Sequence, residues 1–171
     1  MRLRWTGLRR PGLPEVARPA LGSDRPLGWA VDLGSGQFAV ATASALYAVS
    51  AAGDRLWSRP WHLVDGGSWD REQARLTITW VDRADPTQWR FAWDSDFPEV
   101  FRARVQASVV LAETLELPGQ RTARVVVRKD LATQGLLTQT ILGPGVSMRD
   151  PAVSAAVGAA LARVREQVGL E

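Results

Sequence analysis

The chain has 171 residues, 46% apolar and 23% charged, with a formal net charge of +3. This is typical of one globular domain, with room for a small appendage. Having no cysteine and a single histidine, His62, it has no disulfide, no thiolate catalysis, no iron–sulfur cluster and no multi-histidine metal site. No apolar run approaches the ~20 residues that span a bilayer, and the basic N-terminus has no apolar signal core. We therefore expect a cytoplasmic protein without metal or cofactor.

Basic charge is concentrated at the N-terminus. Residues 1–25 hold six arginines and two acidic residues, a net charge of +4, so the rest of the chain carries −1. Such an arm can contact an anionic membrane surface or an acidic partner, or it can be a solvated tail. We do not expect nucleic-acid binding, because stacking on single strands needs basic residues interleaved with aromatic ones in the body. The candidate contact residues are Arg2, Arg4, Trp5, Arg9 and Arg10.

The arm, residues 1–26, ends in a short apolar pattern. Leu13, Val16, Ala17 and Ala20 are spaced along one helical face, and Pro14 stands where a helix would begin. The pattern predicts one or two turns of helix lying on the domain.

Short strands are expected between residues 27 and 93, separated by turn signals such as the GSG at 34–36. Alternation places Leu76, Ile78 and Trp80 on an inward face of one strand, and Trp89, Phe91 and Trp93 on that of the next. These residues are expected to share a core with Phe97 and Phe101 of the helix that follows. The Asp65-Gly66-Gly67 sequence is either a hairpin turn or a bulge within one strand. As a bulge it leaves seven strands, at 27–32, 38–42, 45–49, 55–57, 61–70, 75–81 and 88–93.

A helix is predicted to follow. Asp96 is a good N-cap, Pro98 lies in the first turn and Glu99 completes a capping box. Its apolar stripe, which includes Phe97 and Phe101, should pack against the sheet. That stripe comprises Phe97, Phe101, Val105, Ser108 and Ala112.

The last 50 residues are predicted to form a hairpin, at 121–129 and 136–142, and a helix that begins at Asp150-Pro151 and ends near Val168. A unit of this size buries too little surface to fold alone without disulfide or metal. We expect the helix to dock on its own hairpin and the pair to pack on the preceding domain. Any part of the helix stripe left exposed would be a homodimer face.

The order of seven antiparallel strands and one helix resembles the pleckstrin-homology-like (PH-like) barrel. The segments FAVATASAL (38–46) and RLWSRPW (55–61), and the Trp69-Asp70 pair, resemble bacterial PH-like proteins; RVVVR (124–128) and DPAV (150–153) resemble actinobacterial proteins of unknown function. The resemblance implies an α+β fold: a seven-stranded antiparallel PH-like barrel capped by a helix, with a C-terminal β-hairpin and helix. The implied units are residues 1–26, 27–117 and 118–171.

The sequence shows little that indicates chemistry. PH lipid sites need cations in the loop between the first two strands, but residues 32–37 carry Asp32 and no Lys or Arg. His62 has no nucleophile in its local sequence. Trp57 and Trp61 flank a proline turn, and either an interface or core packing would explain them.

We therefore expect a non-catalytic interaction or scaffold domain whose protein partner is not identified. Two alternatives remain: a peripheral membrane-binding module that uses the basic arm, and a small-molecule-binding or enzymatic barrel pocket.

Overall fold

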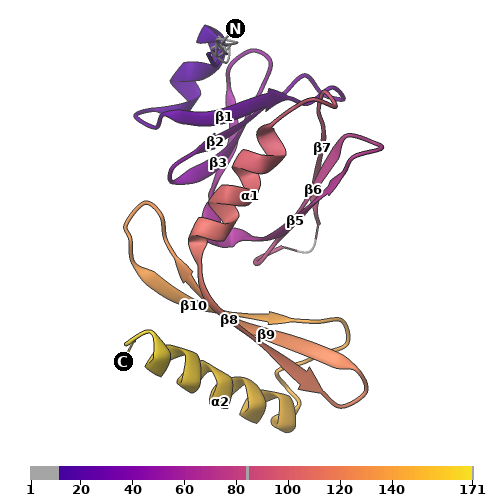
Figure 1. The fold of residues 1–171 in the computed structure, drawn as a ribbon, viewed down its shortest axis with the longest axis vertical. Coiled ribbons are helices and arrows are strands. Elements are labelled where there is room, and N and C mark those ends of the chain that lie inside the picture. The colour runs from indigo at the N-terminus through magenta and orange to yellow at the C-terminus, as the bar shows by residue number, and fades with distance from the viewer. Residues whose placement is uncertain (1–11, 84, 171) are drawn as a thin grey trace, which may run out of the picture.

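The computed structural model describes residues 12–83 and 85–170. Within them the fold is α+β, as predicted, with three antiparallel sheets. Two sheets lie around helix α1, and the third lies beyond the end of α1 with α2 on its outer face (Figure 1). The helical elements are η1 (Glu15–Leu21), η2 (Trp61–Leu63), α1 (Phe97–Ser108) and α2 (Pro151–Gln167). The strands are β1 (Pro26–Val31), β2 (Phe38–Thr42), β3 (Ala45–Val49), β4 (Arg55–Pro60), β5 (Val64–Asp70), β6 (Arg75–Trp80), β7 (Thr87–Arg90), β8 (Val109–Leu117), β9 (Arg121–Lys129) and β10 (Leu136–Leu142).

The first sheet has the strand order β1-β2-β3-β4, and its two central strands are covered on both faces. The predicted N-terminal helix is η1, a 3-10 segment lying on the outer face of this sheet against Phe38, Val40 and other apolar residues. Residues three apart share a side of a 3-10 helix. Ala17 and Ala20 are therefore buried, whereas Val16, expected on the same face, is 46% exposed.

The second sheet, β5-β6-β7, packs its aromatic residues against the other face of the first sheet and against α1. The rings of Phe91 and Phe97 are 5.2 Å apart, edge to face, and those of Trp61 and Phe101 are 5.8 Å apart. The predicted shared core is confirmed for Leu76, Ile78, Trp80, Trp89, Phe91, Phe97 and Phe101, which are all buried.

The prediction for Trp93 is wrong: its side chain is 84% exposed. Strand β7 ends at Arg90, and the Ser95 N–H donates to the carbonyl of Ala92 at 3.0 Å. Trp93 therefore occupies the tip of a turn, where the two-residue alternation of a strand does not apply.

The seven strands form two open sheets, and no closed barrel is found within the described residues. Strands β4 and β5 belong to different sheets because η2 separates them, so the strand expected over 61–70 begins only at Val64. The predicted bulge is present, since the register with β6 shifts between Val64 and Gly66.

The helix stripe predicted through Ala112 ends early, because α1 stops at Ser108 and the chain continues directly into β8. Burial alternates with a period of two through most of β8, the pattern of a strand. Pro118-Gly119 therefore lies in the turn between β8 and β9 rather than after a helix, and Gly119 adopts a φ of 77° there. The C-terminal unit thus starts at residue 109 instead of 118 and contains three strands instead of a hairpin.

Helix α2 docks on this third sheet, as predicted. The Asp150 carboxylate caps it by accepting a hydrogen bond from the Ala152 N–H at 3.0 Å. The buried helix residues Val153, Val157, Ala160 and Val164 pack against Ala123, Val125 and Val127 of β9. The homodimer face expected on this helix stays a prediction.

Trp80 and Trp93 provide a matched test of the aromatic core, because one is 6% exposed and the other 84%. Trp80→Ala should lower the free energy of unfolding by ~3–5 kcal/mol, since it removes a large core side chain. Trp93→Ala should change it by no more than ~0.5 kcal/mol. Urea denaturation of both variants measures the difference, and equal losses would contradict this assignment of the core.

Candidate functional site

A groove with a volume of about 620 Å³ runs along strand β1. Its lining residues come from the start of the described chain, from β1 with Leu33, and from the segment between β7 and α1; they are Gly12, Leu13, Pro26, Leu27, Gly28, Trp29, Ala30, Val31, Leu33, Ala92, Asp94, Ser95 and Asp96. Strand β1 pairs with β2 on one side, and within residues 12–83 and 85–170 no strand pairs with its other side. A terminal strand of this kind can pair with an added strand through its backbone.

The groove is bordered by exposed apolar side chains. Leu27 is 48% exposed, Val31 36% and Leu33 59%. Trp93, the most exposed large apolar residue described, lies in the chain between Ala92 and Asp94, which both line the groove. Clustered exposed apolar residues mark contact surfaces more often than isolated ones do.

The described charged residues of the groove are acidic. Asp94 and Asp96 both line it, and none of the lining residues within 12–83 and 85–170 is a lysine, arginine or histidine. An apolar surface edged by carboxylates favours a basic and apolar ligand over an anionic one.

Asp32 fixes the rim of the groove where β1 ends. Its side chain is buried, and its carboxylate accepts hydrogen bonds from the Ser35 hydroxyl at 2.6 Å and from the Arg90 N–H at 2.8 Å. Burial raises the pKa of Asp32, but these bonds and others from neighbouring backbone N–H groups outweigh burial, so the pKa lies below its ordinary value. The Leu33 N–H donates to the Arg90 carbonyl at 2.7 Å. The acid of this first loop therefore joins the two sheets.

The contact residues predicted from sequence lie elsewhere or in the core. Arg2, Arg4, Trp5, Arg9 and Arg10 are outside the described residues. Trp61 is fully buried, and its Nε1–H donates to the carbonyl of Thr42 at 3.0 Å. Trp57 stacks on Trp89 with 5.6 Å between ring centroids. Of the two alternatives for Trp57 and Trp61, the structure supports core packing.

Sequence reasoning missed the groove, although two signals pointed to it. The 27–31 stretch carries apolar residues on both faces, and a tryptophan follows directly on the last strand before α1. Which strand is terminal in its sheet depends on the topology, however, and the sequence does not specify it.

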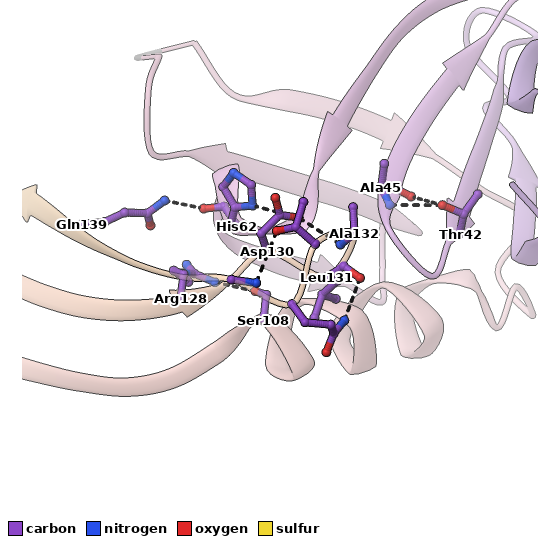
Figure 2. A network of polar contacts seen from close by, with 12 residues as sticks. Thr42, Ala45, His62, Ser108, Arg128, Asp130, Leu131, Ala132 and Gln139 are labelled. Carbon is purple, nitrogen blue, oxygen red and sulfur yellow. Dashed lines mark hydrogen bonds and ion pairs between the residues drawn. The ribbon is translucent and has the colours of Figure 1, made fainter. Parts of the chain in front are cut away.

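A second polar site joins the third sheet to the rest of the molecule (Figure 2). The Arg128 side chain is 1% exposed; it donates to the Ser108 hydroxyl at 2.9 Å and to the Val64 carbonyl at 2.8 Å. Burial lowers the pKa of Arg128 from its ordinary value, and the Asp65 carboxylate opposes that shift. Arg124, on the same strand, pairs with Asp65 at 2.5 Å.

His62 belongs to the same junction. Its carbonyl accepts a hydrogen bond from the Gln139 side chain at 2.7 Å, and its Nδ1 lies 4.0 Å from the Asp130 carboxylate (Figure 2). These contacts connect η2 with the third sheet, which is a structural role. In the part of the chain that the structure describes, no three His, Asp or Glu side chains are grouped to hold a metal ion. None of the described helices is long and apolar enough to cross a membrane.

A third polar cluster surrounds Asp24, just before β1. One oxygen of its carboxylate accepts hydrogen bonds from the hydroxyls of Thr42, Ser44 and Tyr47, at 3.0, 2.6 and 2.9 Å. Burial raises the pKa of Asp24, but the three hydroxyls outweigh burial and the pKa is lowered. Burial and the adjacent carboxylate raise the pKa of Tyr47 to about 12. The cluster anchors the segment between η1 and β1 to the first sheet.

Comparisons with family models, with curated proteins and with solved structures found no match to this chain.

Arg128 should contribute strongly to stability. Arg128→Met keeps much of the side-chain length but leaves the Val64 carbonyl and the Ser108 hydroxyl without this donor, so we expect a loss of about 3 kcal/mol in the free energy of unfolding. Arg71→Met, at an exposed turn, is the control and should change little. Chemical denaturation compares the two, and an unaltered midpoint for Arg128→Met would contradict the assigned role.

Tyr47 is the only tyrosine, so phenolate absorbance reports its ionisation alone. The folded protein should titrate near pH 12, because burial and Asp24 disfavour the phenolate, and the denatured chain near its ordinary pKa of about 10. Because the folded-state pKa is the higher one, stability from this group is complete below about pH 10 and is lost as pH rises towards 12. Asp24→Asn should lower the folded midpoint, and a native midpoint near 10 would contradict the burial of Tyr47.

Proposed function

We propose that this protein is a non-catalytic, cytoplasmic PH-like interaction domain that holds an extended segment of a partner protein along strand β1. One observation carries the proposal: the groove of about 620 Å³ lies along a terminal strand that has no partner strand within the described residues. Extended peptides recognise such edges by adding a strand.

The PH-like assignment rests on the order of the elements. Four antiparallel strands, three antiparallel strands and a helix follow one another, and the helix packs between the two sheets (Figure 1). Asp32 links the end of β1 to the end of β7. Closure of these sheets into a barrel is part of the proposal.

Both backbone hydrogen bonds and side-chain contacts would contribute to the binding of an added strand. An added strand gains hydrogen bonds from β1, and every second side chain of that strand faces the same way. Leu27, Leu33 and Trp93 offer apolar surface to those side chains, while Asp94 and Asp96 favour basic residues among the others. The affinity would come from the backbone and the apolar contacts, and the choice of partner from charge.

The two alternatives from sequence receive less support. The membrane alternative depends on the basic arm, whose candidate contact residues are Arg2, Arg4, Trp5, Arg9 and Arg10. The exposed Trp93 is followed by Asp94, and a carboxylate there is repelled by an anionic lipid surface. For the pocket alternative, the cavity of about 210 Å³ between α1 and the second sheet is smaller than common small-molecule sites. The groove along β1 is large enough, but it follows a terminal strand, which suits an extended peptide.

Peptide selection tests this function with the full chain. Random peptides displayed on phage should yield binders with alternating basic and apolar residues, and these should lose affinity for Leu27→Glu but keep it for Leu56→Glu. The two leucines are matched, because each is 48% exposed and each lies on a terminal strand of the first sheet. Calorimetry of the selected peptides measures the difference. Equal affinity for both variants, or a failure to enrich any peptide, would contradict the proposal.

A further inference from the structure

We infer that a second copy of this chain pairs with strand β8, edge to edge and antiparallel, so that the third sheets of the two copies join into one sheet. The inference goes beyond the proposed function, because β8 and the β1 groove belong to different sheets. The buried stripe of α2 is covered by its own sheet, so the contact surface is the outer edge of β8 and not that stripe.

Strand β8 is a long terminal strand. Its outer side pairs with no strand among residues 12–83 and 85–170. It has nine residues and contains no lysine, arginine, proline or glycine, which commonly protect an unpaired edge. Other terminal strands are protected, because β4 contains Arg55, Arg59 and Pro60 and β7 has only four residues. From Leu111 onward, β8 also pairs with β9 without a register shift.

The outer edge of β8 is open to a second copy. Helix α2 covers one face of the third sheet, and the first two sheets lie beyond the other face (Figure 1). On that other face Ala112, Thr114 and Glu116 are all exposed, so the first two sheets do not cover β8. At the opposite end of the sheet, the residues of β10 up to Ile141 are half-buried. Of these two terminal strands, β8 is the one that a second copy reaches.

The backbone groups of β8 point where an added strand requires them. The Thr122 carbonyl of β9 accepts a hydrogen bond from the Gly143 N–H at 2.9 Å, so the even-numbered residues of β9 turn their backbone groups towards β10. The odd-numbered residues of β9 turn theirs towards β8, where they pair with odd-numbered residues. The outward N–H and C=O groups of β8 therefore belong to the even-numbered residues Ala112, Thr114 and Glu116.

The sequence of β8 is self-complementary in one register. A two-fold axis at Glu113 places Leu111 of one copy opposite Leu115 of the other. The same axis pairs the outward groups of Ala112 with those of Thr114, which gives about four backbone hydrogen bonds. Moving the axis by one residue in either direction places Glu113 opposite a leucine instead. The axis at Glu113 is therefore the one that matches apolar with apolar side chains on the α2 face.

Arg163 of α2 compensates the one charge at this axis. Like charges directly opposite each other destabilise a strand pair, and the axis brings the two Glu113 carboxylates together. Each carboxylate accepts a hydrogen bond from Arg163 of its own chain, and the two side chains are 29% and 51% exposed. Two carboxylates and two guanidinium groups would then meet at the axis, and each carboxylate would have a cation beside it.

The side of α2 that carries Arg163 leaves room for this arrangement. Ala159, Ala156 and Ala152 stand four, seven and eleven residues before Arg163, so they lie on the same side of the helix. An axis perpendicular to the sheet places the two α2 helices side by side on one face, and these small side chains allow them to approach. The strand supplies the specific contacts, and the helix does not obstruct them.

A disulfide at the axis tests the register, because the chain has no cysteine. Glu113 would face itself in a pair without ladder hydrogen bonds, where the Cα atoms are about 4.5 Å apart, a distance that a disulfide joins. Glu113→Cys should form a covalent dimer with oxidised glutathione. Glu116→Cys should not, because its two copies would be about 20 Å apart. Non-reducing electrophoresis compares them, and no cross-link at 113, or an equal one at 116, overturns the inference.

Removing Arg163 tests the charge argument. Arg163→Ala leaves two carboxylates facing each other, so the dissociation constant of the dimer should rise by about tenfold or more. Adding Glu113→Gln removes the repulsion and should restore the constant to within about threefold. Arg149→Ala, at an exposed position before α2, is the control. Analytical ultracentrifugation of the full chain, whose dimer has twice the mass of 18.7 kDa, measures each constant. Equal effects of Arg163→Ala and Arg149→Ala overturn the inference.

Two proline substitutions test the backbone pairing. Thr114→Pro removes an outward N–H from β8, and Thr138→Pro removes one from β10, where the same alternation holds. Only Thr114→Pro should make the chain monomeric, with circular dichroism showing that both variants fold. If Thr114→Pro does not fold, the cross-link at Glu113 decides. A full-length chain that is monomeric at its highest soluble concentration, or a dimer that persists in Thr114→Pro and dissociates in Thr138→Pro, overturns the inference.

Discussion

The buried guanidinium of Arg128 is the interaction through which the third sheet becomes part of the molecule. It lies on β9, yet it donates to the last residue of α1, Ser108, and to the first residue of β5, Val64. Burying an isolated cation is costly, and hydrogen bonds and a nearby carboxylate must compensate for that cost. Val64 and Ser108 can accept these hydrogen bonds, and Asp65 can lie near the guanidinium, only when the third sheet is docked as observed. The buried arginine therefore restricts the position of the third sheet.

Hydrogen-bonded carboxylates also fix the two ends of strand β1. The Asp32 carboxylate accepts hydrogen bonds from Ser35 and Arg90, and the bond to Arg90 holds one end of β1 near β7. The Asp24 cluster fixes the chain before β1. Strand β1 is thus anchored at both ends, while its outer side carries exposed leucine and valine side chains. No strand within the described residues pairs with the outer side of β1, and a strand anchored at both ends is well suited to accept another one, since little order is lost on binding.

The sequence was sufficient where local rules and burial agree. The alternation in β6, the cap and stripe of α2 and the start of α1 near Asp96 are predicted correctly. The capping box itself is not formed, because the Asp96 side chain makes no cap hydrogen bond at the start of α1. The prediction from sequence was wrong where a segment fits both a helical and a strand periodicity. Residues 109–117 continue the helical stripe through Ala112, but they also alternate as a strand does. Pairing with β9 selects the strand. Trp93 was misplaced because the end of β7 is set by a turn. No local pattern distinguishes the buried Arg128 from the exposed arginines, since its partners are distant in sequence.

The candidate site, like the fold, could be predicted only in part from the sequence. The sequence contains a basic N-terminal arm and a first loop without cations. The loop argues against an anionic headgroup at that place, whereas the arm is compatible with an anionic membrane surface, an acidic partner or a solvated tail. The structure adds that the terminal strand β1 and the acidic segment after β7 line one groove. Gly12 and Asp94 are separated by some 80 residues of sequence, and the fold places both of them in the lining of one groove. The topology, and no local pattern, therefore decides which acidic residues share a surface with strand β1.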